Sequence, residues 1–359
     1  MLKVFSQFKG LKKEIYILFF GRLVTAMGNF IWPMLTFFLS EKLGIGDAKI
    51  AFIIGVSALI YIPAAWISGI LADKFNRKHI IILFDLLSVI AFIVTAIIPF
   101  SVYSVITILI GSIFQDMEAA SYDALIADFS TTWQREKAGT LEYLGTNIGV
   151  IFGSTFSGIL FKNYTRLAFL LNGLAIFIST ILIFLFVNMK NKIINEEEHI
   201  NANTIYEEPV DENIKVLKVL KDKPSVLIFT FISCLIWLPA TVYSTLLPLK
   251  LDSIHGLDGA RIFGFLNGFN GFVVIAFTPL LSLILNKVTE IPKSFTGLIL
   301  YGLGLIIFMI TSNTYILFIG MFISTLGEIS SVLGTGPYFS RRVPISHLGR
   351  VSSISNIIL

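Results

Sequence analysis

Gly69-Ile70-Leu71-Ala72-Asp73-Lys74-Phe75-Asn76-Arg77-Lys78 is a charge-dense stretch between two long apolar runs, in a chain where only 14% of the residues are charged. Hydrophobic residues make up 55% of the 359 residues, and the mean hydropathy is +0.84. A soluble globular protein carries far more polar surface than this. Apolar runs of about 20 residues are long enough to cross a bilayer as helices. We therefore predict an all-α polytopic membrane protein in which the quoted stretch is a loop.

The apolar runs predict about ten complete spans and the start of an eleventh, which begins near Val351 and stops at Leu359. The run after the basic N-terminal residues is long enough to span and carries Arg22, so we interpret it as a retained first helix and not as a cleaved signal peptide. The ten spans are placed at roughly 15–39, 50–72, 79–99, 103–127, 139–161, 165–187, 224–248, 260–285, 294–311 and 314–338.

The basic residues alternate between the two sides of this layout. Of the 27 Lys and Arg residues, 20 fall on the side of the N-terminus, six fall on the other side, and Arg22 lies within a span. Cytoplasmic loops carry the excess of Lys and Arg. The alternation therefore predicts that the N-terminus and the middle loop are cytoplasmic. We expect the membrane to be the plasma membrane.

Three regions are predicted: an N-terminal six-helix bundle over 1–187, a cytoplasmic linker over 188–223, and a C-terminal bundle over 224–359. The linker is either a solvated connection or a regulatory segment. The end of span four, Tyr122–Asp128, and the end of span ten, Gly336–Arg342, show weak similarity, as two parallel six-span repeats would. On that basis we expect the second bundle to be incomplete in this sequence.

The quoted stretch resembles the loop G-x-L-A-D-[RK]-x-G-[RK]-[RK], which joins the second and third helices of the major facilitator superfamily. The resemblance implies two six-helix bundles. It also implies a gating loop in which Asp73 helps to close the cytoplasmic side against the start of span eleven, while Arg77 and Lys78 serve as charge partners. Gly69 is expected to allow close helix approach, and Asn76 to adopt a left-handed turn in place of the family's second glycine.

A second resemblance is to the drug–proton antiporter branch of that superfamily. Gly149, Gly153 and Gly158 match its span-five glycine pattern and are expected to pack helices closely, although Ser154 replaces the usual proline. The family's span-four arginine has no counterpart, since that span offers Asp116 and Glu118 instead. Because of this departure, the family's proton mechanism is not expected to carry over unchanged to this chain. The prediction that the protein is a transporter is not affected.

Ionisable residues inside the predicted spans are candidates for proton coupling or substrate binding, because each costs roughly 2.5–3.5 kcal/mol at the bilayer centre. The alternative is that they form fixed pairs that hold helices together, with Arg22 paired to Asp85 or Asp116. Both interpretations stay open for Asp116 and Glu328, while the fixed pair is the favoured interpretation for Asp85, Glu118 and Glu142. The candidates are Asp116, Glu328, Arg22, Glu118 and Asp85.

The sequence carries no nucleotide-binding loop, no cluster of Cys and His and no nucleophile elbow, so we predict neither an enzyme nor a cofactor or metal. The single Cys234 is expected to be a small buried side chain. The resemblance implies a monomeric secondary transporter whose partners are the lipid bilayer, a small-molecule substrate and a proton, with no nucleic acid. Efflux of amphipathic compounds is the favoured activity. Uptake of a sugar or other nutrient and a non-transporting sensor or scaffold are the alternatives.

Overall fold

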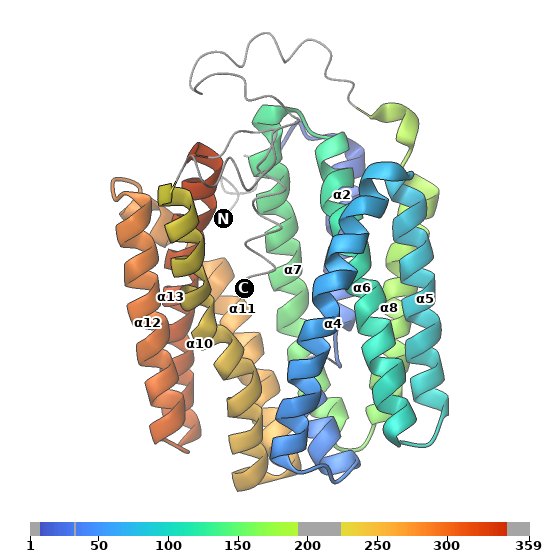
Figure 1. Cartoon of the computed structure of the whole chain (residues 1–359), viewed down its shortest axis with the longest axis vertical. Coiled ribbons are helices and arrows are strands. Elements are labelled where there is room, and N and C mark those ends of the chain that lie inside the picture. The colour runs from blue at the N-terminus through green and yellow to red at the C-terminus, as the bar shows by residue number, and fades with distance from the viewer. Residues whose placement is uncertain (1–7, 32–33, 193–223, 343–359) are drawn as a thin grey trace. The chain divides into compact units, whose positions relative to one another are not determined.

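The apolar runs fold as helices because a helix satisfies its backbone polar groups within its own segment. The structure is a computed structural model that describes residues 8–31, 34–192 and 224–342, and these residues hold helices and no strands. The elements are α2 (Lys13–Gly28), α3 (Leu35–Phe37), η2 (Phe38–Lys42), α4 (Asp47–Lys74), α5 (Arg77–Ile97), α6 (Val102–Asp128), α7 (Thr132–Phe161), α8 (Thr165–Phe186), η3 (Met189–Asn191), α10 (Pro224–His255), α11 (Leu257–Leu285), α12 (Glu290–Ile310) and α13 (Thr314–Arg342) (Figure 1).

Eight helices in the described part of the chain are long and apolar enough to span a membrane. They include α4, α5, α6 and α8, whose bounds lie close to those predicted from the sequence. The total of ten spans stays a prediction, because α2 has only 16 residues and α10 is not among the eight.

The prediction of one continuous helix over 15–39 is wrong. Helix α2 ends at Gly28, and helical structure resumes at Leu35. Asn29 is the C-cap residue, with a non-helical ψ of 72°. A proline has no backbone N–H to continue a helix, and Pro33 follows within a few residues. The first span is therefore two helical pieces with a break between them.

The described helices belong to two compact units. The first comprises Met1–Ile194 together with Pro248–Phe272, and the second comprises Asn195–Leu247 together with Val273–Leu359. The hairpin formed by the end of α10 and the start of α11 thus belongs with the first unit. The boundaries 1–187, 188–223 and 224–359 stay a prediction, and residues 193–223 of the linker lie outside the described residues.

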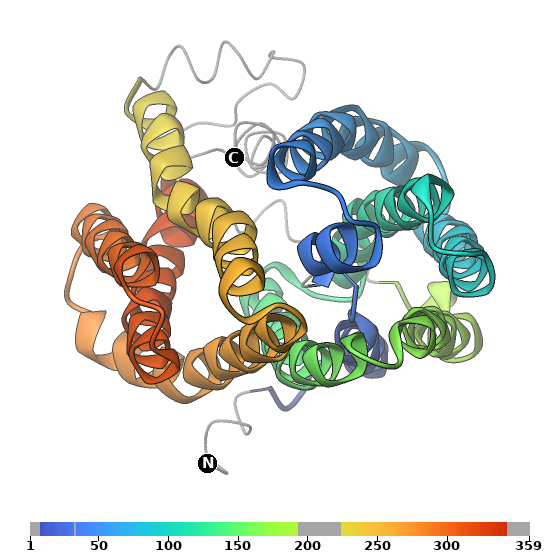
Figure 2. The same cartoon turned by 90° about the horizontal axis from the view of Figure 1, so that it is seen from below.

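In the first unit, α2 packs against α7 and α8, while α5 packs against α6 and α8 (Figure 2). We call the end of this unit that carries Lys74, Arg77 and Lys78 the basic end, and the end that carries Lys42 and Lys162 the opposite end. An apolar cluster fills the bundle toward the basic end. Its buried members include Ile15, Leu18, Ile81, Leu125, Phe129, Leu141, Ile183 and Val187.

In the second unit, α12 packs along α13. Glycines allow the two backbones to approach closely: a Cβ placed on Gly327 would lie 2.6 Å from the backbone nitrogen of Tyr301. Large apolar side chains are exposed on α12, as a lipid-facing surface requires, among them Phe295, Ile299, Leu303 and Ile306.

Candidate functional site

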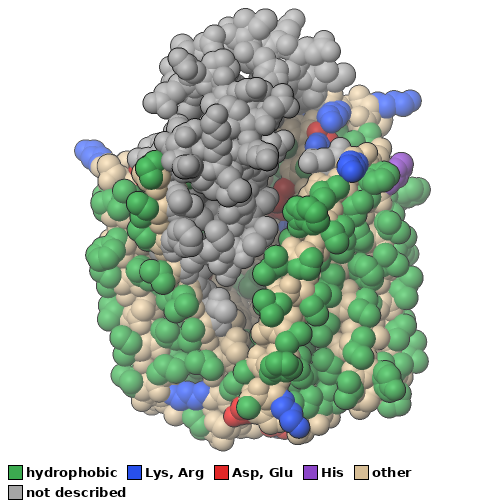
Figure 3. Space-filling view, in the orientation of Figure 1, with side chains coloured by type: hydrophobic (Ala, Val, Ile, Leu, Met, Phe, Trp, Pro, Cys, Tyr) green, Lys and Arg blue, Asp and Glu red, His purple; other side chains and the backbone are tan. Residues whose placement is uncertain are grey.

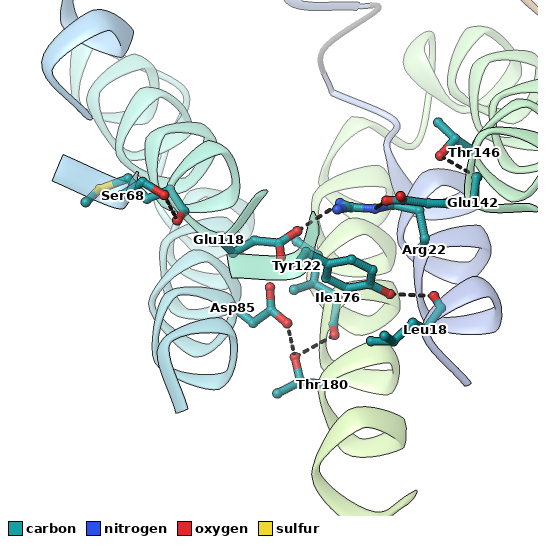
Figure 4. A network of polar contacts seen from close by, with 11 residues as sticks. Leu18, Arg22, Ser68, Asp85, Glu118, Tyr122, Glu142, Thr146, Ile176 and Thr180 are labelled. Carbon is teal, nitrogen blue, oxygen red and sulfur yellow. Dashed lines mark hydrogen bonds and ion pairs between the residues drawn. The ribbon is translucent and has the colours of Figure 1, made fainter. Parts of the chain in front are cut away.

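Arg22 is the centre of a polar cluster inside the first unit. Its Nη1 donates a hydrogen bond of 2.9 Å to Glu118 Oε1, and its Nε donates one of 3.0 Å to Glu142 Oε1 (Figure 4). These residues come from α2, α6 and α7, so one guanidinium joins three helices. The side chain of Glu118 is 5% exposed, and those of Arg22 and Glu142 are each 18% exposed.

Tyr122 holds the guanidinium in place. It follows Glu118 by four residues on α6, so both side chains lie on one face of the helix. The Cζ atom of Arg22 lies 4.0 Å from the centre of the Tyr122 ring, and the Tyr122 hydroxyl donates to the carbonyl of Leu18 (Figure 4). This cation–π contact orients Arg22 toward both carboxylates.

Asp85 extends the cluster to α5 and α8. It is 5% exposed, and its Oδ2 accepts a hydrogen bond of 2.8 Å from Thr180 Oγ1 (Figure 4). Asp85 also lies close enough to Glu118 for the two carboxyl groups to repel each other when both are ionised. We call Arg22, Asp85, Glu118 and Glu142 the Arg22 cluster.

The Arg22 cluster holds three carboxyl groups and one guanidinium, which is an excess of negative charge in a largely buried place. The Oε2 atom of Glu118 is buried and has no hydrogen-bond donor among the described residues. A proton bound by one of these carboxyl groups would relieve the repulsion. The arrangement can therefore take up and release a proton while Arg22 keeps at least one carboxylate in place.

A cavity of about 330 Å³ reaches the Arg22 cluster between α6 and α7, on the side of the basic end. One of its lining residues is Glu142, so a carboxylate bonded to Arg22 also faces an open space. Its lining residues are Asp123, Ile126, Ala127, Ser130, Gly139 and Glu142.

The structure corrects the predicted partner of Arg22. The fixed pair of Arg22 with Asp85 or Asp116 is wrong, since the ion-pair partners are Glu118 and Glu142. Asp116 is exposed and lies two positions from Glu118, so it points to another face of α6. There it interacts electrostatically with Tyr61 of α4.

Glu328 lies apart from these residues, on α13 in the second unit. It is half-buried and interacts electrostatically with Tyr243 of α10. The sequence reasoning missed Tyr122, Asp123 and Thr180. The four-residue spacing between Glu118 and Tyr122 was the available signal for the first of these.

The predicted gating loop is short: α4 ends at Lys74 and α5 begins at Arg77. Arg77 forms an ion pair with Asp128 at the end of α6, and its guanidinium also donates to the carbonyl oxygens of Ala72 and Ala124 at 3.3 and 3.2 Å. Lys78 Nζ donates to the carbonyl oxygens of Phe184 and Val187 at 2.9 and 2.7 Å, which caps the end of α8. The loop is thereby tied to α6 and α8.

One expectation for this loop is wrong, and the expected close approach at Gly69 has no partner among the described residues. Asn76 is not in a left-handed turn, because its φ is −65°, and its side chain instead caps α5 by accepting from the Lys78 backbone N–H at 3.1 Å. A Cβ on Gly69 would meet no described atom within 4 Å, so this glycine makes no close helix approach in the described structure. The side chain of Asp73 and the start of span eleven lie outside the described residues.

The three glycines of the second resemblance lie at contacts of α7. A Cβ on Gly149 would be 2.4 Å from the Cβ of Ala26, and one on Gly153 would be 2.5 Å from the Ala26 carbonyl oxygen, so both face α2. A Cβ on Gly158 would be 2.8 Å from the Ala260 carbonyl oxygen on α11. Residues larger than glycine would force these helices apart.

Comparison with known proteins now assigns the family. Residues 18–359 match the family described as the Major Facilitator Superfamily. The chain belongs to this superfamily. As a member of the Major Facilitator Superfamily it is a multi-pass membrane transporter and not an enzyme.

Relatives of known name support the same class. A Na(+), Li(+), K(+)/H(+) antiporter of Planococcus maritimus is 23% identical over 351 residues, which cover 91% of this chain and 81% of that protein. The multi-drug resistance efflux pump PmrA of Streptococcus pneumoniae is 28% identical over 207 residues, which cover 54% of this chain and 50% of the pump.

Solved structures share the superfamily fold. A peptide transporter POT variant in complex with sulfate has a TM-score of 0.74 at 18% identity, over 98% of this chain and 86% of that one. A bacterial homolog of the human lysosomal transporter Spinster has a TM-score of 0.72 at 13% identity, over 97% of this chain and 80% of that one. At such identities the likeness shows the fold alone.

Proposed function

We propose that this transporter exports small amphipathic molecules across the plasma membrane in exchange for protons. The observation that carries the proposal is the Arg22 cluster, in which one guanidinium holds two carboxylates and a third lies close by. The names of the two relatives, an antiporter and a multidrug efflux pump, support it.

In this proposal Glu118 carries the coupling proton. It bonds to Arg22 through Oε1, while its buried Oε2 lacks a donor among the described side chains. Protonation of Glu118 would weaken its pairing with Arg22 and strengthen the hold of Arg22 on Glu142. Substrate and proton could then bind in alternation as the two bundles rock about a midplane site.

The remaining features fit the same cycle. Arg77 and Lys78 hold the gating loop, and Asp73 closes the basic end in one of the two states. The distribution of Lys and Arg supports a cytoplasmic location for the basic end and the N-terminus. Asp116 and Glu328 serve as further substrate or proton contacts, and the protein acts as a monomer.

Exchange of a monovalent metal cation for protons is the second candidate function. It is favoured by the name of the Planococcus maritimus relative, which matches 91% of this chain. The excess of carboxyl groups in the Arg22 cluster suits a positively charged substrate, whether that substrate is a metal cation or an amphipathic organic cation.

Reconstituted proteoliposomes test the proposal. A pH gradient would be imposed, and the fluxes of a lipophilic dye, of Na⁺ and of K⁺ would be followed together with proton movement. We expect substrate and protons to move in opposite directions, and we expect Glu118→Gln to abolish this coupling while substrate–substrate exchange continues. Asp47→Asn, at an exposed position on α4, is the matched control.

Each other outcome has a clear meaning. If substrate and protons moved in the same direction, the protein would be assigned to uptake and not to export. Na⁺ or K⁺ flux without dye flux would favour the second candidate. If Glu118→Gln kept full proton coupling, the assignment of the proton to Glu118 would be refuted, and the absence of every flux would favour a sensor or scaffold.

A further inference from the structure

A second cavity, of about 460 Å³, lies at the basic end of the first unit, away from the Arg22 cluster. It is formed where α5 begins and α8 ends. We call it the rim pocket, and its lining residues are Asn76, Lys78, His79, Phe184, Leu185, Val187, Asn188, Met189 and Lys190.

The polar half of the rim pocket is basic. Lys78, His79 and Lys190 line it, and no Asp or Glu does. The Lys78 ammonium has three N–H groups, of which two are used by the carbonyls of Phe184 and Val187, so one N–H remains to bind a ligand.

The other half of the rim pocket is apolar and continues onto the lipid-facing surface. Phe184 and Leu185 are 61% and 62% exposed. Farther along α5, Leu83 and Ile90 are 51% and 58% exposed. Figure 3 shows basic side chains and a histidine at the rim of this unit, above a surface covered by hydrophobic side chains.

We propose that the rim pocket binds the headgroup of an anionic glycerophospholipid. Its phosphate would contact Lys78 and Lys190, and its acyl chains would lie along the exposed apolar side chains of α5 and α8. This combination favours a lipid over a free phosphate, because half of the lining is apolar and is continuous with the bilayer surface.

Such a site would act on the gating loop directly. Asn76 caps α5 and Lys78 lies in its first turn, so both belong to the charged stretch Gly69–Lys78 as well as to the rim pocket. A bound lipid would therefore favour the arrangement in which Lys78 stays on the end of α8. This part of the inference does not depend on which substrate is carried.

Lipid binding to the purified full-length chain in a neutral detergent tests the proposal, with native mass spectrometry as the readout. The probes are phosphatidylglycerol, phosphatidylcholine and inorganic phosphate. We expect retained phosphatidylglycerol and a preference for it over phosphatidylcholine. Lys190→Gln should weaken phosphatidylglycerol binding about five-fold, the factor that corresponds to about 1 kcal/mol per basic side chain.

Two control variants distinguish lipid binding at the rim pocket from a general effect of the protein's positive charge on lipid binding. Lys49→Gln removes an exposed lysine at the opposite end and should leave the preference unchanged. Lys190→Arg keeps the charge and should keep the binding. Equal retention of the two lipids by the wild type would overturn the proposal, as would unchanged binding by Lys190→Gln. Inorganic phosphate competing at equal concentration would point to a free anion and overturn the lipid assignment, while transport could still be intact.

Discussion

Arg22 and Glu118 join α2 to α6 through a hydrogen bond of 2.9 Å between two side chains that are 18% and 5% exposed. Both side chains are therefore largely shielded from water. The pair therefore makes the position of α2 depend on the charge of Glu118, and the same guanidinium passes this dependence on to Glu142 on α7.

Removal of Arg22 should destabilise the first unit strongly. Arg22→Ala leaves Glu118 buried without its cation, and breaking a buried pair costs about 3–5 kcal/mol. The double variant Arg22→Ala/Glu118→Gln should recover much of this loss, because the more deeply buried of the two carboxylates that Arg22 pairs with is then neutral, and Glu142 faces a cavity. Thermal unfolding of the detergent-solubilised protein measures both. Equal melting of the single and double variants would contradict the pairing as a source of stability.

Loss of the Thr180 hydroxyl should affect Asp85. Thr180→Val removes the donor to Asp85 Oδ2 at nearly constant volume, which costs about 1–3 kcal/mol for a buried acceptor. Asp85→Asn removes the charge and should cost less. The melting temperatures of the two variants provide the comparison. Thr107→Val is the matched control on α6, because it also removes a threonine hydroxyl that bonds within the unit.

A side chain at Gly153 should force α7 away from α2. Its Cβ would lie 2.5 Å from the Ala26 carbonyl oxygen, which is backbone and cannot rotate aside. We expect Gly153→Val to cost about 1–3 kcal/mol or to prevent folding. Yield and melting temperature would be measured beside Gly55→Ala, whose added Cβ meets no described atom within 4 Å. A Gly153→Val protein as stable as Gly55→Ala would show that the helices do not pack this closely.

The gating loop should control turnover without controlling insertion. Arg77→Ala frees Asp128 from one of its two cations, since Lys192 Nζ also lies 2.9 Å from Asp128 Oδ1. Arg77→Ala and Asp73→Ala should therefore slow substrate exchange while the protein still reaches the membrane. Transport rate per inserted molecule is the measurement. Normal rates in both variants would remove the loop from the transport cycle.

Glu41, at the opposite end, lies beside Asp252 near the end of α10. Its ionisation should make the stability of this contact depend on pH. Reduced hydration raises its pKa, and a hydrogen bond with Asp252 and the charge of Asp252 add to this effect, while Lys42 opposes it. A carboxyl group whose pKa is raised in the folded state stabilises the folded state at low pH. That stabilisation is lost as the pH rises through the raised pKa.

This dependence is tested by measuring thermal stability from pH 4.5, the unperturbed pKa of a glutamate, to higher pH. We expect the free energy of unfolding of the wild type to fall relative to that of Glu41→Gln as the pH rises over this window, because an amide does not ionise. Asp47→Asn serves as the control at the same end. Parallel curves for the wild type and Glu41→Gln would show that this pair does not titrate in the window.

The sequence predicts most of the helices because about 20 apolar residues in a row have few other stable structures in a bilayer. The predicted bounds of α8 at 165–187 and the observed Thr165–Phe186 differ by one residue. The break after Gly28 was missed because hydropathy does not register a lost backbone hydrogen bond. The partners of Arg22 were missed because they depend on the rotation of α6 and α7 about their axes. Composition does not determine that rotation.

The break in the first span separates the Arg22 cluster from the contact between Ser40 and Asp252, which one continuous helix would link. Arg22 lies in the piece before the break, and Ser40, which donates to Asp252, lies in the piece after it. A rigid rod would carry any tilt at one membrane face to the other. Because the helical conformation ends at Asn29, we expect the piece that carries Arg22 and the piece that carries Ser40 to tilt independently in the proposed transport cycle.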